Sequence, residues 1–272
     1  SLHRDLRGFY AAKDDLFPER TSGLIFFENM MGIFFTGRDL TEEVLAEVGP
    51  KARLVVAEQK YDPAIGTPAT QLPAFALVLP LKDHEKFSMV VEEAWQKAVG
   101  LINFTRGQKA QPGLIIDRPV HRGTKYTVAC FTPPREADGK AVDARFNFRP
   151  ALAMPGNHLI LSSTDGLAED IMDALSKEAA RPARPRAGVH SLIEVEGPQV
   201  ASILAANREN LIRQNMVDKG NAREQAETEV GMLLAIVKHV SRVTLTVGTD
   251  KGRSRASLQV HLNLPSGESG GK

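Results

Sequence analysis

The stretch VTLTVGTDKGRSRASLQVHLNL, residues 243–264, decides the fold class of this chain. Apolar residues alternate with threonine over residues 243–247, and leucine and valine alternate with polar residues over residues 258–264. A turn containing two glycines separates the two runs at residues 248–252. A period of two is typical of strands with one face against a core and one face in solvent. The stretch therefore predicts a β-hairpin with one buried face and one solvent-exposed face.

Three other segments share a plan in which an apolar strand runs into a helix. LVLPLKD at residues 77–83 and LILSSTD at residues 159–165 end in residues that can cap a helix, and LIEVEGP at residues 192–198 ends in a proline suited to a first helical turn. The plan arises either from an internal duplication or from the ordinary pattern of a sheet with helices. Both explanations give an α+β fold, an antiparallel or mixed β-sheet with amphipathic helices packed on one face. If the duplication is real, the strand–helix unit is an internal repeat.

The remaining segments extend this pattern along the chain. The first 49 residues are predicted to be helical, Asp83 is an expected N-cap, and Asn221 with Glu224 resembles a capping box. Further strands are expected at residues 54–57, 75–81, 114–116, 126–131, 146–152, 157–162 and 191–195. The segment RPARPR at residues 181–186 is the expected linker, because its two prolines are incompatible with a helix. It predicts a division into residues 1–180 and residues 189–265, with one continuous domain as the alternative.

Composition excludes two classes of function. The chain has 272 residues, of which 42% are hydrophobic, and its 34 basic and 33 acidic residues give a net charge of +1. A balanced charge lacks the one-sided positive field of nucleic-acid-binding proteins, so no nucleic-acid partner is expected. The longest apolar stretch, residues 24–35, is interrupted by Glu28 and Asn29. It falls short of the roughly 20 apolar residues that a membrane-spanning helix needs, so no transmembrane segment is expected.

The cellular address is left open by the residues themselves. A single cysteine, Cys130, permits no intramolecular disulfide, which is compatible with a reducing compartment and equally with export. The chain begins at Ser1, and we expect it to be processed or truncated, so the lack of a leader sequence indicates nothing about export.

The layout of strands and helices also carries a family resemblance. An ALVL strand leads through Lys-Asp into a helix within residues 75–97, a strand follows at residues 123–131, and PALA with GNHLILSSTD occupies residues 150–165. This layout resembles a bacterial family of exported or lipid-anchored proteins that is classed as a domain of unknown function, over about residues 54–264. The resemblance implies an α+β fold and an extracytoplasmic address, in the periplasm or cell envelope. It supplies no catalytic residues, metal ligands or cofactor.

Two common site motifs are missing from the sequence. It contains no HExxH zinc motif and no phosphate-binding glycine loop, and its seven histidines are scattered. Cys130 alternates onto the face of Val128 and is predicted to be buried and unreactive. The sequence therefore predicts no catalytic residue and no cofactor, and an enzyme of unrecognised type is the third of three hypotheses.

One segment suggests a binding site. LIFFENMMGIFF at residues 24–35 holds four phenylalanines and two methionines on nearly all sides of a helix. It is either a surface for an apolar ligand or protein partner, or a central helix buried all round, which is the interpretation we favour. The candidate residues are Phe26, Phe27, Met30, Met31, Phe34 and Phe35. The preferred function is a non-catalytic binding or structural module of the bacterial cell envelope, and the alternative is a carrier of an apolar ligand in a cavity between helices and sheet.

Overall fold

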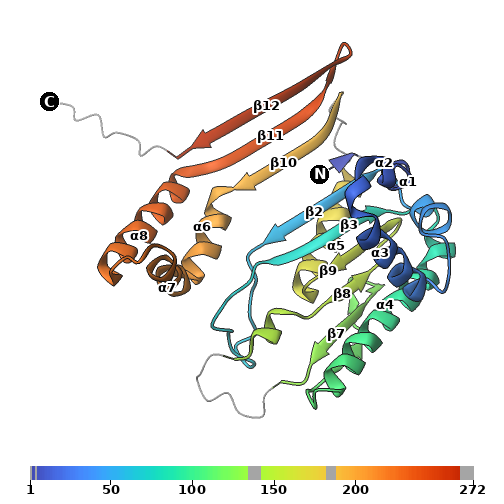
Figure 1. The fold of residues 1–272 in the computed structure, drawn as a ribbon, viewed down its shortest axis with the longest axis horizontal. Coiled ribbons are helices and arrows are strands. Elements are labelled where there is room, and N and C mark those ends of the chain that lie inside the picture. The colour runs from blue at the N-terminus through green and yellow to red at the C-terminus, as the bar shows by residue number, and fades with distance from the viewer. Residues whose placement is uncertain (1, 4, 134–141, 182–187, 264–272) are drawn as a thin grey trace. The chain divides into compact units, whose positions relative to one another are not determined.

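The computed structural model describes residues 2–3, 5–133, 142–181 and 188–263 (Figure 1). The chain divides into two compact units. The first comprises residues 1–56, 60–68 and 74–184, and the second comprises residues 57–59, 69–73 and 185–272. Most of the predicted linker at residues 181–186 lies outside the described residues.

Helices dominate the first 47 residues of the first unit, as predicted. They are α1 (Leu6–Ala11), α2 (Lys13–Leu16), η1 (Pro18–Arg20), α3 (Thr21–Phe34), η2 (Leu40–Val44) and η3 (Leu45–Glu47). Two longer helices and one short turn of helix follow: α4 (His84–Gly107), η4 (Ala144–Asn147) and α5 (Asp165–Ala180). Both predicted caps of the longer helices are confirmed. The Asp83 carboxylate accepts a hydrogen bond from the Lys86 N–H, and the Thr164 hydroxyl accepts one from the Leu167 N–H.

The strands of the first unit form one sheet with the order β1-β2-β3-β9-β8-β7-β4, and β5 and β6 form a separate hairpin. Their bounds are β1 (Leu2–His3), β2 (Lys51–Ala57), β3 (Ala74–Pro80), β4 (Leu114–Asp117), β5 (Val120–His121), β6 (Thr124–Lys125), β7 (Thr127–Phe131), β8 (Ala151–Ala153) and β9 (His158–Ser162). The pairing of β3 with β9, β8 with β9 and β7 with both β8 and β4 is antiparallel, which confirms the α+β class. The strand predicted at residues 146–152 is shorter than expected, because its first residues belong to η4.

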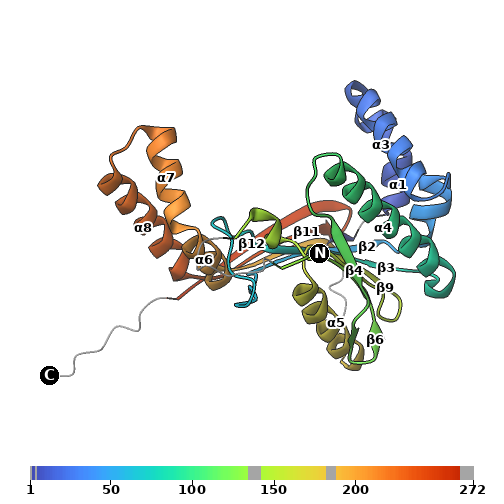
Figure 2. The same cartoon turned by 90° about the horizontal axis from the view of Figure 1, so that it is seen from below.

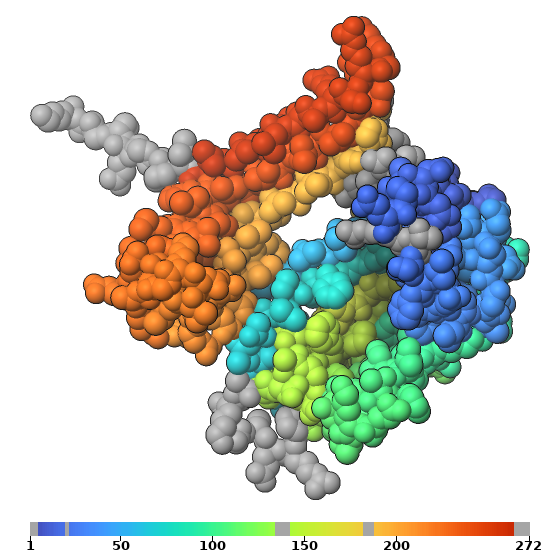
Figure 3. All heavy atoms as spheres, viewed as in Figure 1, coloured from blue at the N-terminus to red at the C-terminus, as the bar shows by residue number. Residues whose placement is uncertain are grey.

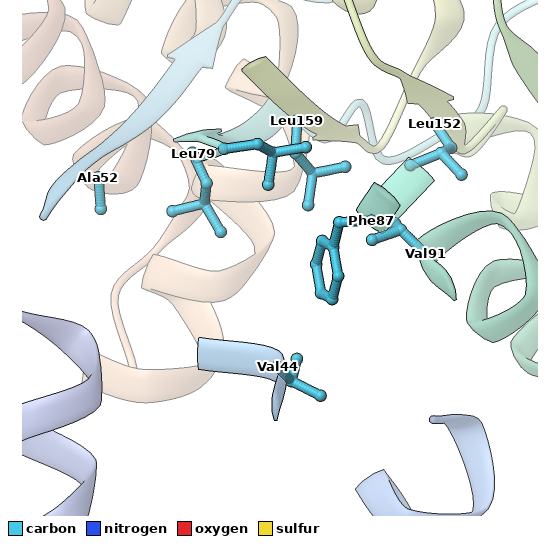
Figure 4. Packing of buried hydrophobic residues seen from close by; sticks show 8 residues of the cluster. Val44, Ala52, Leu79, Phe87, Val91, Leu152 and Leu159 are labelled. Atoms are coloured by element: carbon cyan, nitrogen blue, oxygen red, sulfur yellow. The ribbon is translucent and has the colours of Figure 1, made fainter. Parts of the chain in front are cut away.

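The core of the first unit lies between this sheet and α4. Leu79 pairs directly with Leu159, so both side chains point to one face of the sheet. On that face they meet Phe87 and Val91 of α4, as Figure 4 shows. Helix α5 lies on the opposite side of the sheet from α4 (Figure 2) and buries its own apolar stripe there, including Ile171. The helices thus cover both faces of this sheet, where the sequence predicted one.

The second unit holds three strands and three helices among its described residues. They are β10 (Val189–Glu196), α6 (Gly197–Ala206), α7 (Arg208–Lys219), α8 (Arg223–His239), β11 (Val240–Asp250) and β12 (Arg253–Leu262), with the strand order β12-β11-β10. The predicted hairpin is confirmed, and its strands extend further into the turn than expected. Lys251 and Gly252 alone form the turn, with φ of 47° and 77°. Positive φ at both positions is the geometry of the tight turn that matches strand twist.

The predicted burial of this hairpin is wrong for β12. Leu258 lies opposite Leu245 as the alternation requires, but 64% of Leu258 is exposed, and Val260 and Leu262 are exposed to a similar extent. The physical reason is that α6 and α8 lie against β10 and β11, which leaves the apolar face of β12 without a second layer.

The predicted capping box of α8 is also wrong. The helix begins at Arg223, and Asn221 lies one position outside the N-cap. The Asn221 side-chain amide instead donates hydrogen bonds to Asn215 Oδ1 at 2.8 Å and to Glu229 Oε1 at 3.1 Å. Gly220 ends α7 in the left-handed region, with φ of 69°, and this turn directs Asn221 into the space between α7 and α8.

Candidate apolar binding surface

Helix α3 holds the candidate segment and lies at the edge of the first unit. In Figure 2 it projects away from the sheet, and Figure 3 shows the N-terminal helices, in dark blue, at the outer surface. Within the unit α3 contacts α4, η1 and η2. Its C-terminal end is fixed by Gly37, whose N–H donates to the Gly32 carbonyl at 2.7 Å with φ of 75°.

One side of α3 is packed against the protein. Phe35, just after the helix, packs against the core cluster that includes Phe87. The Phe27 and Tyr10 rings lie 6.2 Å apart, which joins α3 to α1. Lys13 Nζ lies 3.0 Å from a carboxylate oxygen of Glu28, and its hydrogen bond to Glu28 raises the pKa of Lys13. These contacts fix the rotation of α3 about its own axis.

The other side of α3 is exposed and carries three large apolar residues beside Ser22 and Asn29. Ile25 is 52% exposed, Phe26 68% and Ile33 69%. Residues 25, 26 and 33 lie within about 100° of one another around a helix with 3.6 residues per turn, so they share one side. We call Ile25, Phe26 and Ile33 the α3 surface.

The structure distributes the six candidate residues between the two sides of α3. Phe26 belongs to the exposed side, Phe27 is just exposed at 38%, and the other four are partly buried. The favoured interpretation, a central helix buried all round, is therefore wrong. Its physical reason is position: α3 packs at the periphery of the unit, where neighbours cover only one side. Ile25 and Ile33 were not predicted, because the candidates were chosen as phenylalanines and methionines rather than by helical angle.

A second apolar area lies on strands β2 and β3. Ala52 and Leu79 both belong to the core cluster, so alternate residues of these neighbouring strands share its face. Those residues are Leu54, Val56, Phe75 and Leu77, and they are exposed by 69%, 56%, 47% and 36%. The α4 helix and η2 cover only one end of the face. We call these four residues the strand patch.

A shallow groove of about 430 Å³ runs beside α4. It is lined by Ser88, Met89, Glu92, Glu93, Gln96 and Met154. Its carboxylates already have partners: Glu92 accepts hydrogen bonds from Thr127 and Arg118 at 3.1 Å, and Glu93 lies 2.9 Å from Lys97 Nζ. The hydrogen bond from Lys97 lowers the pKa of Glu93. Both acids of the groove are thus paired with side chains of the chain itself.

A polar cluster tests the enzyme hypothesis. His121 Nε2 lies 2.8 Å from Asp173 Oδ1, the Arg122 guanidinium lies 2.8 Å from the other Asp173 oxygen, and the Tyr126 hydroxyl donates to Glu169 at 2.5 Å. The hydrogen bond from His121 lowers the pKa of Asp173, and burial followed by the bond to Glu169 raises the pKa of Tyr126. A phenol held in its protonated form is a poor base or nucleophile.

These contacts connect the β5–β6 hairpin and Tyr126 to α5. Sequence reasoning missed the cluster, because His121 and Asp173 are 52 positions apart and share no motif.

Cys130 is half-buried, so its predicted burial is wrong. It lies opposite Ile115 of the edge strand β4, and Ile115 is 55% exposed. The core-facing neighbours Ala129 and Phe131 point to the other side of the strand. The incomplete cover at the sheet edge leaves the thiol partly accessible.

Two kinds of feature were sought among the described residues: a cluster of metal ligands and a helix that could span a membrane. These residues contain no group of three or more histidine, cysteine or acidic side chains that could hold a metal ion. None of their helices combines the length and apolar character needed to span a bilayer.

Family models, curated proteins and solved structures offer no match to this chain. Its function must accordingly be inferred from its own surfaces.

Proposed function

We propose that this chain is a non-catalytic binding module that holds an apolar partner on the α3 surface. The observation that carries the proposal is the exposure of Phe26 and Ile33, at 68% and 69%, on a helix whose other side is fastened to the unit. Large exposed apolar side chains that cluster on one face mark interaction sites more often than isolated ones do.

The energetics support a partner of substantial contact area. Fully burying an isoleucine or phenylalanine side chain contributes about 1.5–3 kcal/mol. About two thirds of this remains available at Phe26 and Ile33, and about half at Ile25. The three side chains together therefore offer roughly 3–5 kcal/mol of apolar burial to a partner. That amount is sufficient for the central cluster of an interface, and a stable complex needs further contacts around it.

A carrier of an apolar ligand is the second candidate, and the strand patch favours it. Leu54, Val56, Phe75 and Leu77 continue the face that α4 covers elsewhere, and an apolar ligand could occupy the uncovered part. The outward direction of Phe26 and Ile33 supports the binding module instead, because a ligand cavity requires its lining to point inward.

The location of this module in a bacterial cell envelope remains a proposal that depends on the family resemblance alone. Fractionation of the source cells with an antibody against the chain tests it. Recovery with the cytoplasmic fraction would remove the envelope from the proposal and leave the α3 surface unaffected.

The decisive experiment is native mass spectrometry of the protein made in its own host. Phe26→Asp with Ile33→Asp should abolish an associated macromolecule without changing the melting temperature by more than a few degrees. Met89→Asp is the matched control, because Met89 is 79% exposed on α4 and outside the α3 surface. An associated small molecule that survives the α3 changes and is lost in Leu54→Asp would favour the carrier. Association unaffected by all of these variants would overturn both candidates.

A further inference from the structure

The outer edge of β12 is a second exposed feature of the chain, separate from α3. β12 is the last strand in the order β12-β11-β10, and Figure 1 shows it as the outermost of the three. Its pairing with β11 runs without a register shift from Arg242–His261 to Asp250–Arg253. Every β12 residue except Ser257 is exposed, and no residue in the described part of the chain pairs with its outer edge.

One hydrogen bond determines which residues of β12 direct their N–H and C=O groups to this edge. The Thr249 N–H donates to the Gly188 carbonyl at 2.7 Å, on the side of β11 away from β12. Thr249 lies opposite Ser254, so this is a non-hydrogen-bonded pair of the β11–β12 ladder. Such pairs alternate along a ladder, and the N–H and C=O groups of Ala256, Leu258 and Val260 therefore also point to the outer edge. A row of unpaired groups of this kind is a template for another strand.

The side chains define the chemistry of a strand that would fit. Ala256, Leu258 and Val260 share the apolar face, while Arg253 and Arg255 point to the other. Residues 250–255 carry three basic side chains against one acidic, a local charge of +2. Arg255 is 73% exposed, and its guanidinium lies 4.0 Å from Asp250, at the limit of an ion pair. A second copy of β12 would bring no carboxylate to Arg255, so the charge favours an acidic partner.

We propose that the edge of β12 binds an extended polypeptide segment in which apolar residues alternate with acidic ones. The segment adds a fourth, antiparallel strand to the order β12-β11-β10. Its backbone pairs with residues 254, 256, 258 and 260, its apolar side chains extend the face of Leu258, and its carboxylates lie opposite Arg253 and Arg255. This mode of recognition requires only a sheet edge and alternate side chains.

A pair of synthetic peptides tests the proposal by fluorescence anisotropy with the full chain. The first is Thr-Val-Thr-Ile-Thr-Val-Glu-Val-Glu with blocked ends, which places its two glutamates opposite Arg255 and Arg253. The second replaces both glutamates with lysine. Each glutamate is attracted by the arginine opposite it, whereas each lysine is repelled, so the glutamate peptide should bind at least about tenfold more tightly, and salt should reduce the difference.

Variants of β12 distinguish the contribution of backbone hydrogen bonds to peptide binding from the contribution of charge pairs. Ala256→Pro removes an outward N–H without removing a β11–β12 bond, so it should abolish peptide binding and leave the melting temperature nearly unchanged. Ala256→Val is the matched control and should bind like the wild type. Arg255→Glu should reduce the preference for the glutamate peptide by at least about fivefold.

Three results would overturn the proposal. The first is equal affinity for the two peptides, and the second is normal binding by Ala256→Pro. The third is a dimer of the free wild-type protein in sedimentation velocity that Ala256→Pro converts to a monomer, because the edge then binds a second copy.

Discussion

Phe26→Asp is the substitution that most directly tests the assignment of the α3 surface. About a third of Phe26 is covered in the folded chain. A fully buried aromatic side chain removes roughly 150–250 Å² from water, so this third corresponds to about 50–80 Å². At about 25 cal/mol per Å² the change should cost roughly 1–2 kcal/mol, and the new carboxylate remains in solvent. Phe87→Asp should instead prevent stable folding, because Phe87 is 4% exposed in the core cluster and would bury an unpaired charge.

Trp95 supplies a probe specific to the first unit. It is the single tryptophan of the chain. It lies in α4, where it packs against the core cluster that contains Phe87 and against a second buried cluster that contains Val99 and Leu114. Urea titration followed by Trp95 fluorescence should give Phe26→Asp a cooperative transition with the wild-type slope and a slightly lower midpoint. Unfolding of Phe26→Asp in buffer, comparable with that of Phe87→Asp, would show that α3 is a core helix and would refute the surface.

Three further predictions concern other parts of the chain. Leu258→Ala should cost less than about 1 kcal/mol, because Leu258 is 64% exposed, whereas Leu159→Ala, at 5% exposure, should cost about 2–5 kcal/mol in urea titrations. The hydrogen bond from Lys219, followed by that from Asn215, lowers the pKa of Glu229 from 4.5 to about 2. A lowered carboxyl pKa stabilises the fold above pH 4.5 and loses that contribution as the pH falls from 4.5 to about 2, so Lys219→Met should raise the pKa of Glu229 measured by NMR titration. Cys130 is half-buried and should react with a thiol reagent at the same rate in the wild type and in Leu159→Ala; a faster reaction in that variant would show that labelling requires unfolding.

Local chemistry made much of the fold predictable. Asp83 and Thr164 were identified as caps because a short polar side chain before an amphipathic run satisfies free N–H groups wherever the helix lies. The terminal hairpin was predictable because alternation and a glycine turn specify pairing through neighbours in sequence. Each of these signals acts over a few residues and needs no knowledge of the rest of the chain.

Contacts between residues that are far apart in the sequence were predicted less well. Asn221 has the composition of a helix cap, but the left-handed Gly220 before it directs the side chain between α7 and α8, where it meets Glu229. His121 and Asp173 become partners only after the β5–β6 hairpin lies against α5. The spacing of residues in the sequence indicates neither contact. A polar side chain can form hydrogen bonds to several groups, and the tertiary structure decides which of them it meets.

The exposed apolar residues show what a sequence pattern can predict and what it cannot. Alternation identifies which face of β2 or β12 is apolar, and helical angle identifies the side of α3, but neither shows whether a second layer lies against it. Leu54 and Leu79 belong to the same apolar face of the sheet, yet 69% of Leu54 and 8% of Leu79 are exposed. The chain thus carries apolar residues beyond the area that its own helices cover. Uncovered leucine and phenylalanine risk aggregation, and the variants of the α3 surface and the strand patch test whether a partner covers them.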